Sequence, residues 1–307
     1  LRYIVEKNLT LGLLLCCAVG FSLPALGQIP PWVVQWLVGI VMLFAWFELR
    51  LEALKQVQFW PLLAFYGLRF LLLPIIAFGL ATTAAPGFAS GLMLFFLMPA
   101  GVSSPALTAL HGGNATLALA LVVLSSLLTP FVVPVICRLL LGESAITLPP
   151  LPLLWSLLGI VFIPAGIYAL IGRHKAVVTF TKAHGRFWSI FLILSVVSIV
   201  LARQKTMMLE NLPLLATLTA VSFAAFGVLY VVGWWGAGRS ATRSDKIALA
   251  MASGLNNVAL GVSLAFLYGS SLDSLLLVIC EVPWGLALIP FRWVLQRQGQ
   301  NPRAGGH

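Results

Sequence analysis

Charged residues are scarce in this chain, and acidic residues are the scarcest of them. Only 8% of the 307 residues are charged, with 8 Asp and Glu against 18 Lys and Arg. An average soluble domain carries roughly a quarter charged residues, so this chain lacks the polar surface that water requires. Because 61% of the residues are hydrophobic and the mean hydropathy is +1.04, the solvent must be lipid. The sequence therefore predicts an all-α membrane protein.

Other absences exclude other classes. The basic residues, which give a net charge of +10, occur in short loops without interleaved aromatics, so we expect no nucleic-acid partner. The cysteines lie inside apolar runs, where they behave as small hydrophobes and predict no disulfide framework. We find no metal-ligand spacing, no phosphate-binding loop and no set of nucleophile, base and orienting residue. We therefore expect neither an enzyme nor a bound metal or cofactor.

Apolar runs of sufficient length fill most of the chain. A helix needs about 20 apolar residues to cross the hydrocarbon core. The ten runs are 10–27, 31–49, 60–81, 87–110, 115–141, 151–172, 186–202, 211–236, 246–268 and 272–292. No small-residue cleavage site follows the first run, so we interpret it as a span and not as a signal peptide. The Gly-rich tail 298–307 is expected to be disordered.

The basic residues are distributed unevenly between the two ends of these spans. If all ten runs cross, 14 Lys and Arg fall on one side and only 3 on the other, Arg138, Arg203 and Lys205. Lys and Arg accumulate in cytoplasmic loops. We therefore expect a multi-pass protein of a bacterial-type inner membrane with both termini in the cytoplasm.

Two of the runs contain residues that interrupt helices. The breaks are predicted at Pro99, Gly101, Pro105 and Gly254. Proline removes a backbone hydrogen bond, and glycine weakens a helix. Unwound backbone is tolerated at this depth only in protein or beside a cavity, and paired short segments point to a transporter's binding site. Ordinary kinked helices packed through small residues are the alternative.

The two interrupted runs occupy matching places in the chain. With ten spans, they are the fourth members of two five-helix halves, 1–149 and 150–307. Five is an odd number, so the second half enters the membrane from the opposite side. The sequence therefore predicts two inverted repeats.

Two charges stand alone in mid-membrane. Arg69 is nine residues into the third run and Glu281 nine residues into the tenth, so each lies about 13 Å from its entry side. An unpaired charge there costs at least about 2.5–3.5 kcal/mol. We expect the two to neutralise each other, or a bound ion or substrate to do so. The alternatives are snorkelling of Arg69 to an interface and a protonated Glu281 hydrogen-bonded to a neighbouring helix.

Polar residues at the breaks complete a candidate binding site. The expected substrate-binding residues are Arg69, Ser103, Ser104, Asn256, Asn257 and Glu281. Arg69 and the helix N-termini at the breaks make this region electropositive. The sequence therefore predicts a small anionic organic substrate.

Several local patterns occur together over most of the chain. They are Leu49-Arg50-Leu51-Glu52 with Pro61, Pro74, the broken fourth run, Gly113-Asn114 before a fifth run with Ser125 and Pro134, and Gly254-Leu255-Asn256-Asn257. In order and spacing they resemble the bile acid:sodium symporter family, within the superfamily that includes arsenite and riboflavin transporters. The resemblance implies a panel of spans 1, 2, 6 and 7 against a core of spans 3–5 and 8–10. Substrate would bind between them, and their relative movement would give alternating access.

The same resemblance implies sodium sites that are degenerate here. The implied coupling-ion positions are Arg69, Ser104, Ser253, Leu255 and Asn256. Around them, Pro105 replaces an asparagine, Ala118 and Val122 replace hydroxyl residues, Ala252 replaces a glutamate and Arg69 replaces a glutamine. A guanidinium within about 5 Å would repel a bound cation by several kcal/mol. We hypothesise that Arg69 takes the electrostatic role of the second sodium ion.

Taken together, these features predict a secondary active transporter of a small organic anion. Sodium coupling is what the resemblance implies, and proton coupling at Glu281 is the variant to test beside it. One alternative is a metalloid efflux permease of the same superfamily. It is weakened because the broken fourth run of this chain has no cysteine to serve as a soft ligand. The others are a non-transporting membrane receptor and an intramembrane hydrolase, which would need paired catalytic groups.

Overall fold

The computed structural model describes residues 9–48, 57–142 and 149–299. These residues are almost entirely helical, and their one β-type pairing is an isolated bridge. Seven described helices are long and apolar enough to cross a membrane: α3 (Pro31–Glu48), α4 to α5 (Phe59–Ala84), α8 (Ala115–Leu141), α9 (Pro150–Ile171), α10 (Lys175–Glu210), α11 (Leu212–Gly236) and α14 to α16 (Ser271–Trp293). The prediction of an all-helical, multi-pass membrane protein is confirmed.

Shorter helices fill the positions of the remaining runs. They are α2 (Leu9–Ser22), the 3₁₀ turns η1 (Pro24–Gln28) and η4 (Pro86–Phe88), α6 (Ala89–Leu97), α7 (Ser104–Leu110), α12 (Arg243–Gly254) and α13 (Val258–Tyr268). The predicted first run, 10–27, therefore ends its α-helix at Ser22 because Pro24 begins a separate 3₁₀ turn.

The third run forms one continuous segment with a widened turn inside it. α4 (Phe59–Tyr66) and α5 (Leu73–Ala84) flank η3 (Gly67–Leu72), which is a π-helix. Pro74, two residues after η3, has no N–H to donate to the carbonyl four residues earlier, so the regular pattern cannot pass through this point. π-Turns inside α-helices occur frequently at functional sites.

Two other spans depart from the predicted boundaries. α10 spans Lys175–Glu210, whereas the apolar run predicted only 186–202. Its polar ends contain no proline, so the helix continues beyond the apolar stretch. The tenth run is divided into α14 (Ser271–Ile279), α15 (Glu281–Leu286) and α16 (Leu288–Gly299), because Pro283 and Pro290 each remove a backbone donor.

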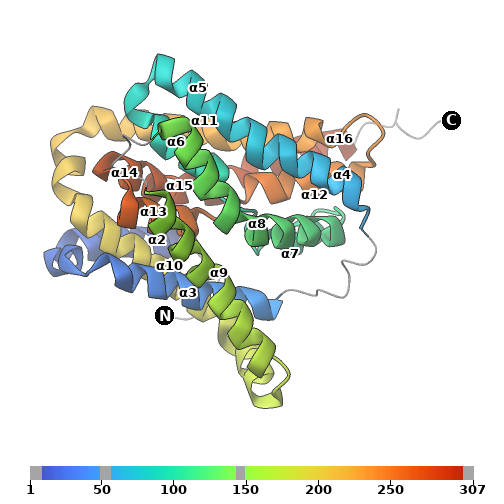
Figure 1. Cartoon of the computed structure of the whole chain (residues 1–307), viewed down its shortest axis with the longest axis horizontal. Coiled ribbons are helices and arrows are strands. Elements are labelled where there is room, and N and C mark those ends of the chain that lie inside the picture. Colours follow the sequence, from blue (N-terminus) through green and yellow to red (C-terminus); the bar gives the residue numbers. More distant parts are fainter. Residues whose placement is uncertain (1–8, 49–56, 143–148, 300–307) are drawn as a thin grey trace.

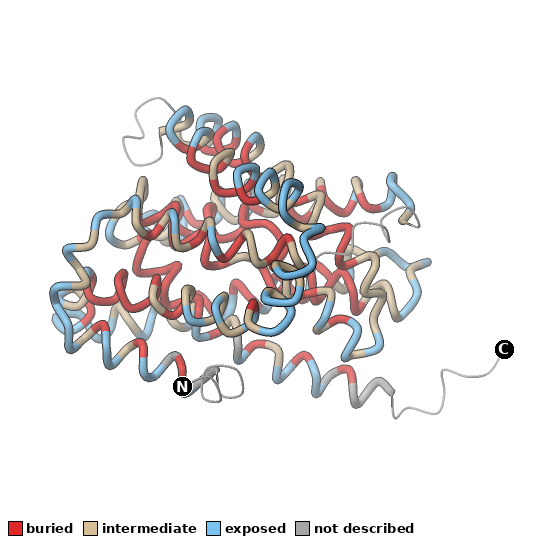
Figure 2. Tube along the Cα trace, turned by 90° about the horizontal axis from the view of Figure 1, so that it is seen from below, coloured by how far each residue is buried: buried red, intermediate tan, exposed pale blue. Residues whose placement is uncertain are grey.

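The helices pack in two mutually contacting groups. α10 packs against α2 and α3, and α3 packs against α9. A second set of contacts joins α11 to α12, α5 to α6, α7 to α8 and α13 to α14. Figure 1 shows α2, α3 and α10 together, with α4, α5 and α11 at the opposite edge of the molecule. Figure 2 shows the buried residues concentrated in the middle of the molecule, with exposed residues on the outer helices.

Both predicted breaks are present, and they pair with each other. α6 ends at Leu97 and α7 begins at Ser104, whereas α12 ends at Gly254 and α13 begins at Val258. Pro99 and Gly101 lie in the first gap, but Pro105 does not. It occupies the first turn of α7, where a missing N–H costs nothing, so its assignment as a break was wrong.

An antiparallel bridge joins the two gaps at Ala100 and Asn256. The Gly101 N–H donates to the Leu255 carbonyl at 2.6 Å, and the Asn257 N–H donates to the Pro99 carbonyl at 2.7 Å. Each unwound segment thus provides hydrogen-bond partners for backbone groups of the other segment. This pairing is what makes two unwound segments tolerable in a hydrocarbon environment.

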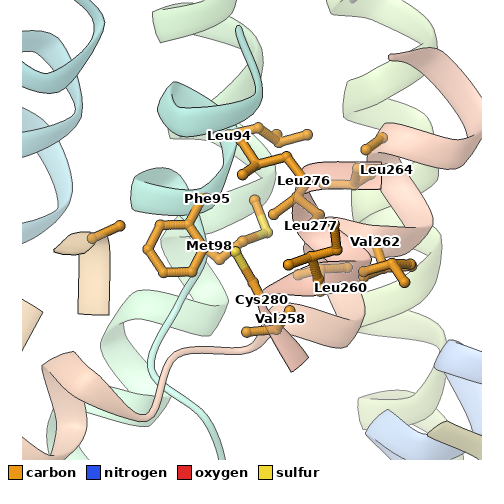
Figure 3. Packing of buried hydrophobic residues seen from close by; sticks show 14 of the residues in the cluster. Leu94, Phe95, Met98, Val258, Leu260, Val262, Leu264, Leu276, Leu277 and Cys280 are labelled. Carbon is orange, nitrogen blue, oxygen red and sulfur yellow. The ribbon is translucent and has the colours of Figure 1, made fainter. Parts of the chain in front are cut away.

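Apolar side chains surround the paired gaps on one side. Figure 3 shows Leu94 of α6 and Met98 just after it facing Leu276 and Leu277 of α14, whereas the Phe95 ring points to the other side. All five side chains are buried. This packing fixes α6 and α14 around the crossing.

Gly101 allows the close approach of the two gaps. A Cβ at this position would lie 2.5 Å from the Leu255 carbonyl oxygen, a backbone atom that cannot move aside cheaply. We therefore predict that Gly101→Ala lowers the free energy of unfolding by about 1–3 kcal/mol, as overpacking typically does. Thermal denaturation in detergent measures this. The matched control is Gly79→Ala, because a Cβ on Gly79 meets no atom within 4 Å; equal melting temperatures for both variants would contradict the prediction.

Candidate functional site

Arg69 lies at the centre of the crossing and bonds both broken helices. Its side chain, carried by the π-turn η3, is 0% exposed. Nη1 donates to the Phe96 carbonyl at 2.7 Å, and Nη2 donates to the Ser253 carbonyl at 3.4 Å. The alternative in which Arg69 snorkels to an interface is therefore wrong.

The two carbonyls that receive these bonds belong to helix ends. Phe96 is in the last turn of α6 and Ser253 in the last turn of α12. The C-terminal end of a helix carries partial negative charge, and transporters use such ends to hold cations. The guanidinium carbon also lies 4.5 Å from the centre of the Phe70 ring, a cation–π geometry. Two charge-assisted bonds of about 1.5–3 kcal/mol each are comparable with the cost of placing a charge at this depth.

Glu281 is positioned separately from Arg69. No ion pair joins the two within the described residues, so in this structure they do not neutralise each other. Glu281 begins α15 and is 8% exposed, and α15 contacts α2. It therefore lies where the group of α2, α3, α9 and α10 meets the rest of the molecule.

Several buried polar atoms near the breaks lack a hydrogen-bond partner in the described part of the chain. They are Arg69 Nε, Ser104 Oγ, Ser253 Oγ and Asn256 Oδ1. Buried polar groups are satisfied in the great majority of cases, so unsatisfied ones require an explanation such as water, an ion or a ligand. The amide of Asn256 is satisfied on one side only, because its Nδ2 donates to the Phe95 carbonyl at 3.0 Å whereas its Oδ1 has no partner among the described residues.

The other two predicted binding residues face different surroundings. Ser103 is only partly buried in the turn before α7. Asn257 caps α13, because its Oδ1 accepts from the Leu260 N–H at 3.1 Å. Its Nδ2 donates to Met42 Sδ at 3.8 Å, a contact that reaches α3. Asn257 therefore connects the second break to the neighbouring helix group.

Three of the positions that replace oxygen-bearing residues belong to an apolar cluster. Ala118, Val122 and Ala252 are buried together with Ala100 and Phe70. None of these side chains offers an oxygen to a cation. The Leu255 and Ser253 carbonyls are already used by Gly101 and Arg69.

Sequence reasoning assigned no role to two residues that hold the bridge in place. Ser125 of α8 accepts from the Ala100 N–H at 3.1 Å, and Trp284 of α15 donates its Nε1–H to the Asn256 carbonyl at 3.2 Å. These bonds add one partner to the backbone of each bridged residue. A serine within an apolar run was the available signal for Ser125. Nothing in the sequence distinguished Trp284 from the other tryptophans, of which the chain has 10 in all.

Space beside the crossing is small. A cavity of about 20 Å³ separates the first break from α3 and α9, and it is lined by Met42, Ala45, Trp46, Val102, Val123, Ser126 and Val161. That volume holds about one water molecule. A larger cavity of about 470 Å³ lies among the ends of α4, α8 and α11, with Gln58, Asn114 and Asp245 in its wall.

Contacts at the end of α13 hold the two helix groups together. The Tyr268 hydroxyl is hydrogen-bonded to Ser156 and donates to the Pro152 carbonyl at 3.3 Å, both on α9. Arg203 of α10 lies over the Phe266 ring at 4.8 Å. The space between the groups is therefore closed at this end.

Some predicted features lie outside the described residues. These are the Leu49–Glu52 pattern, the basic residues Arg2, Lys7 and Lys55, and the tail from residue 300 onward.

Removing the Ser125 hydroxyl tests its part in the bridge. We predict that Ser125→Ala lowers the free energy of unfolding by about 1–3 kcal/mol, because the buried Ala100 N–H loses its acceptor. Thermal melting in detergent measures the change. Ser195→Ala is the control, because that exposed hydroxyl bonds only its own helix. A Ser125→Ala variant as stable as Ser195→Ala would refute the assignment.

Comparison with known proteins agrees with this geometry. A family model described as the sodium bile acid symporter family matches residues 36–211, more than half of the chain. The uncharacterized sodium-dependent transporter YocS of Bacillus subtilis (strain 168) is similar, with 27% identity over 267 residues that cover 83% of this chain and 80% of that protein. The chain therefore belongs to the sodium bile acid symporter family, whose members are membrane transporters.

Proposed function

We propose that this protein is a secondary active transporter that moves a small organic anion across the inner membrane by alternating access. The observation that carries the proposal is the backbone bridge between two interrupted helices, with a buried guanidinium bonding both. Paired broken helices at mid-membrane are the usual location of a transporter's substrate and ion sites.

Matching positions in the two halves support an inverted repeat of ten spans. Asn256 follows its bridge partner Ala100 by 156 residues, and Ser270, the N-cap of α14, follows Asn114, the N-cap of α8, by the same 156 residues. The bridge itself has the symmetric hydrogen bonds expected where a two-fold axis passes between equivalent segments.

Polar contacts at the ends of the same helices repeat this relationship. Asn114, at the start of α8, donates to Asp245 Oδ1 at 2.9 Å, at the start of α12. Ser90, at the start of α6, donates to Asp273 Oδ1 at 2.7 Å, at the start of α14. The start of each half's fifth span thus bonds the start of the other half's fourth span.

The group of α2, α3, α9 and α10 serves as the panel in this proposal, and the other helices serve as the core. Substrate would bind where Met42 and Trp46 of α3 face Val102 and Asn257 at the breaks. Movement of the core relative to the panel would open this space. The distribution of basic residues favours cytoplasmic termini.

Arg69 takes the role of a coupling cation in this proposal. The family name and the name of the Bacillus relative favour sodium coupling. In this chain, however, a permanent cation bonds the helix-end carbonyls, and Ala118, Val122 and Ala252 offer no side-chain oxygen. We therefore propose that the second sodium ion is replaced by the guanidinium.

Sodium-specific stabilisation tests this replacement. We expect the wild-type protein to melt at the same temperature in NaCl and KCl of equal ionic strength. The double variant Arg69→Gln with Ala252→Glu introduces the glutamine and the carboxylate that the family resemblance implies at these positions. We expect this variant to melt at a higher temperature in NaCl than in KCl. A bound ligand raises stability according to its concentration relative to its Kd. Strong stabilisation of the wild type by sodium, measurable whether or not the variant folds, would overturn the proposal.

Glu281 is the proposed proton carrier. Its side chain is buried at the start of α15, which contacts α2 of the proposed panel. One turn later, Trp284 bonds the Asn256 carbonyl, so a change at Glu281 can reach the second break. Protonation would remove the buried negative charge at this boundary.

Neutralising Glu281 separates proton coupling from exchange. With a carboxylate substrate found by thermal-shift screening, we expect Glu281→Gln to abolish uptake driven by a pH gradient in liposomes and to leave substrate exchange within about twofold. Both activities depend on the same substrate site, but only the first needs a titrating group. Equal loss of both activities would indicate a purely structural carboxylate.

Counterflow in liposomes tests transport itself. A carrier loaded with unlabelled carboxylate accumulates labelled carboxylate transiently, whereas a receptor or an enzyme does not. A metalloid efflux permease would show counterflow with arsenite and not with carboxylates.

A further inference from the structure

The turn between α9 and α10 carries a concentrated basic surface. Arg173, Lys175 and Lys182 are exposed there, and we refer to these three residues as the basic foot. The sequence contains no Asp or Glu between Glu143 and Glu210, so the foot has no acidic neighbour along the chain. Figure 1 shows this turn projecting from the rest of the molecule.

The length of α10 carries the foot beyond the apolar part of the helix. Its 36 residues span roughly 54 Å, whereas the hydrocarbon core is about 30 Å thick. The contact of Gly185 with Phe44 and of Tyr168 with Trp46 shows that this part of the turn is level with the end of α3. Lys175 and Lys182 lie further along α10 toward its start. The foot is therefore at the height of the lipid headgroups.

Exposed aromatic side chains accompany these charges. Phe180 is 49% exposed and Trp188 is 39% exposed, on the same helix as Lys175 and Lys182. Basic residues beside exposed aromatics are the combination by which helices bind an anionic membrane surface, with the rings entering the acyl boundary and the cations meeting phosphates.

We propose that the basic foot binds the headgroups of anionic phospholipids. The three side chains of the foot carry one sign of charge, form no ion pair within the described residues, and have exposed aromatic rings beside them on α10. The inference does not depend on the proposed transport function. If that function holds, the bound lipids anchor α9 and α10, and with them the panel, while the core moves.

Lipid titration followed by native mass spectrometry tests this proposal. Protein in mild detergent is titrated with phosphatidylglycerol and with phosphatidylcholine. We expect wild type to retain phosphatidylglycerol preferentially, and the triple variant R173Q/K175Q/K182Q to bind it about tenfold more weakly, because each surface charge attracts anionic lipid independently. The charge-retaining triple variant R173K/K175R/K182R should bind as the wild type does.

Removing basic residues elsewhere on the expected cytoplasmic side of the membrane provides the control. Arg239→Gln with Lys246→Gln removes two charges near the start of α12, away from the foot. This variant should keep wild-type lipid binding. Equal loss in this control would show that overall charge, and not the foot, attracts the lipid, and would overturn the proposal. So would a neutral triple variant, folded by its melting temperature, that retains phosphatidylglycerol as well as wild type.

Discussion

A backbone that leaves its helix in mid-membrane must find new partners for its N–H and C=O groups, and here two such segments find them in each other. The bridge between Ala100 and Asn256 is short, but it satisfies donors and acceptors on both sides. Everything else at the centre follows from this pairing. Gly101 is needed for the close approach, Ser125 and Trp284 each bond one of the bridged residues, and Arg69 bonds the carbonyls that the terminated helices leave behind.

The balance of charge at this centre differs from what sodium would provide. Sodium brings oxygen ligands together and can leave, whereas Arg69 is covalently fixed and bonds only the carbonyls of Phe96 and Ser253. The apolar cluster of Ala118, Val122 and Ala252 supports the proposed replacement of sodium by Arg69, because a site without an ion needs no ligand side chains. Under this proposal, a member of the sodium bile acid symporter family holds its broken helices with a fixed cation.

The sequence predicted the features that depend on chemistry scarce in a membrane. Proline, glycine and lone charges stand out in an apolar run, so the breaks and the unusual position of Arg69 were predictable. Pro105 was misread because the same residue that breaks a helix interior also starts a helix, and composition does not distinguish the two. The true extent of α10 was hidden because hydropathy measures the lipid-facing stretch and not the helix. The partners of Arg69 were unpredictable, because both are backbone carbonyls and carry no side-chain signal.

A cation that belongs to the chain stores no energy in a gradient. It cannot be taken up on one side of the bilayer and released on the other, so no electrochemical work can be drawn from it. If the guanidinium has replaced an ion, the step that the ion once drove must be powered by another species that crosses, or the carrier equilibrates its substrate without concentrating it. The two hydrogen bonds that fix Arg69 thus bear directly on how large a substrate gradient the carrier can build.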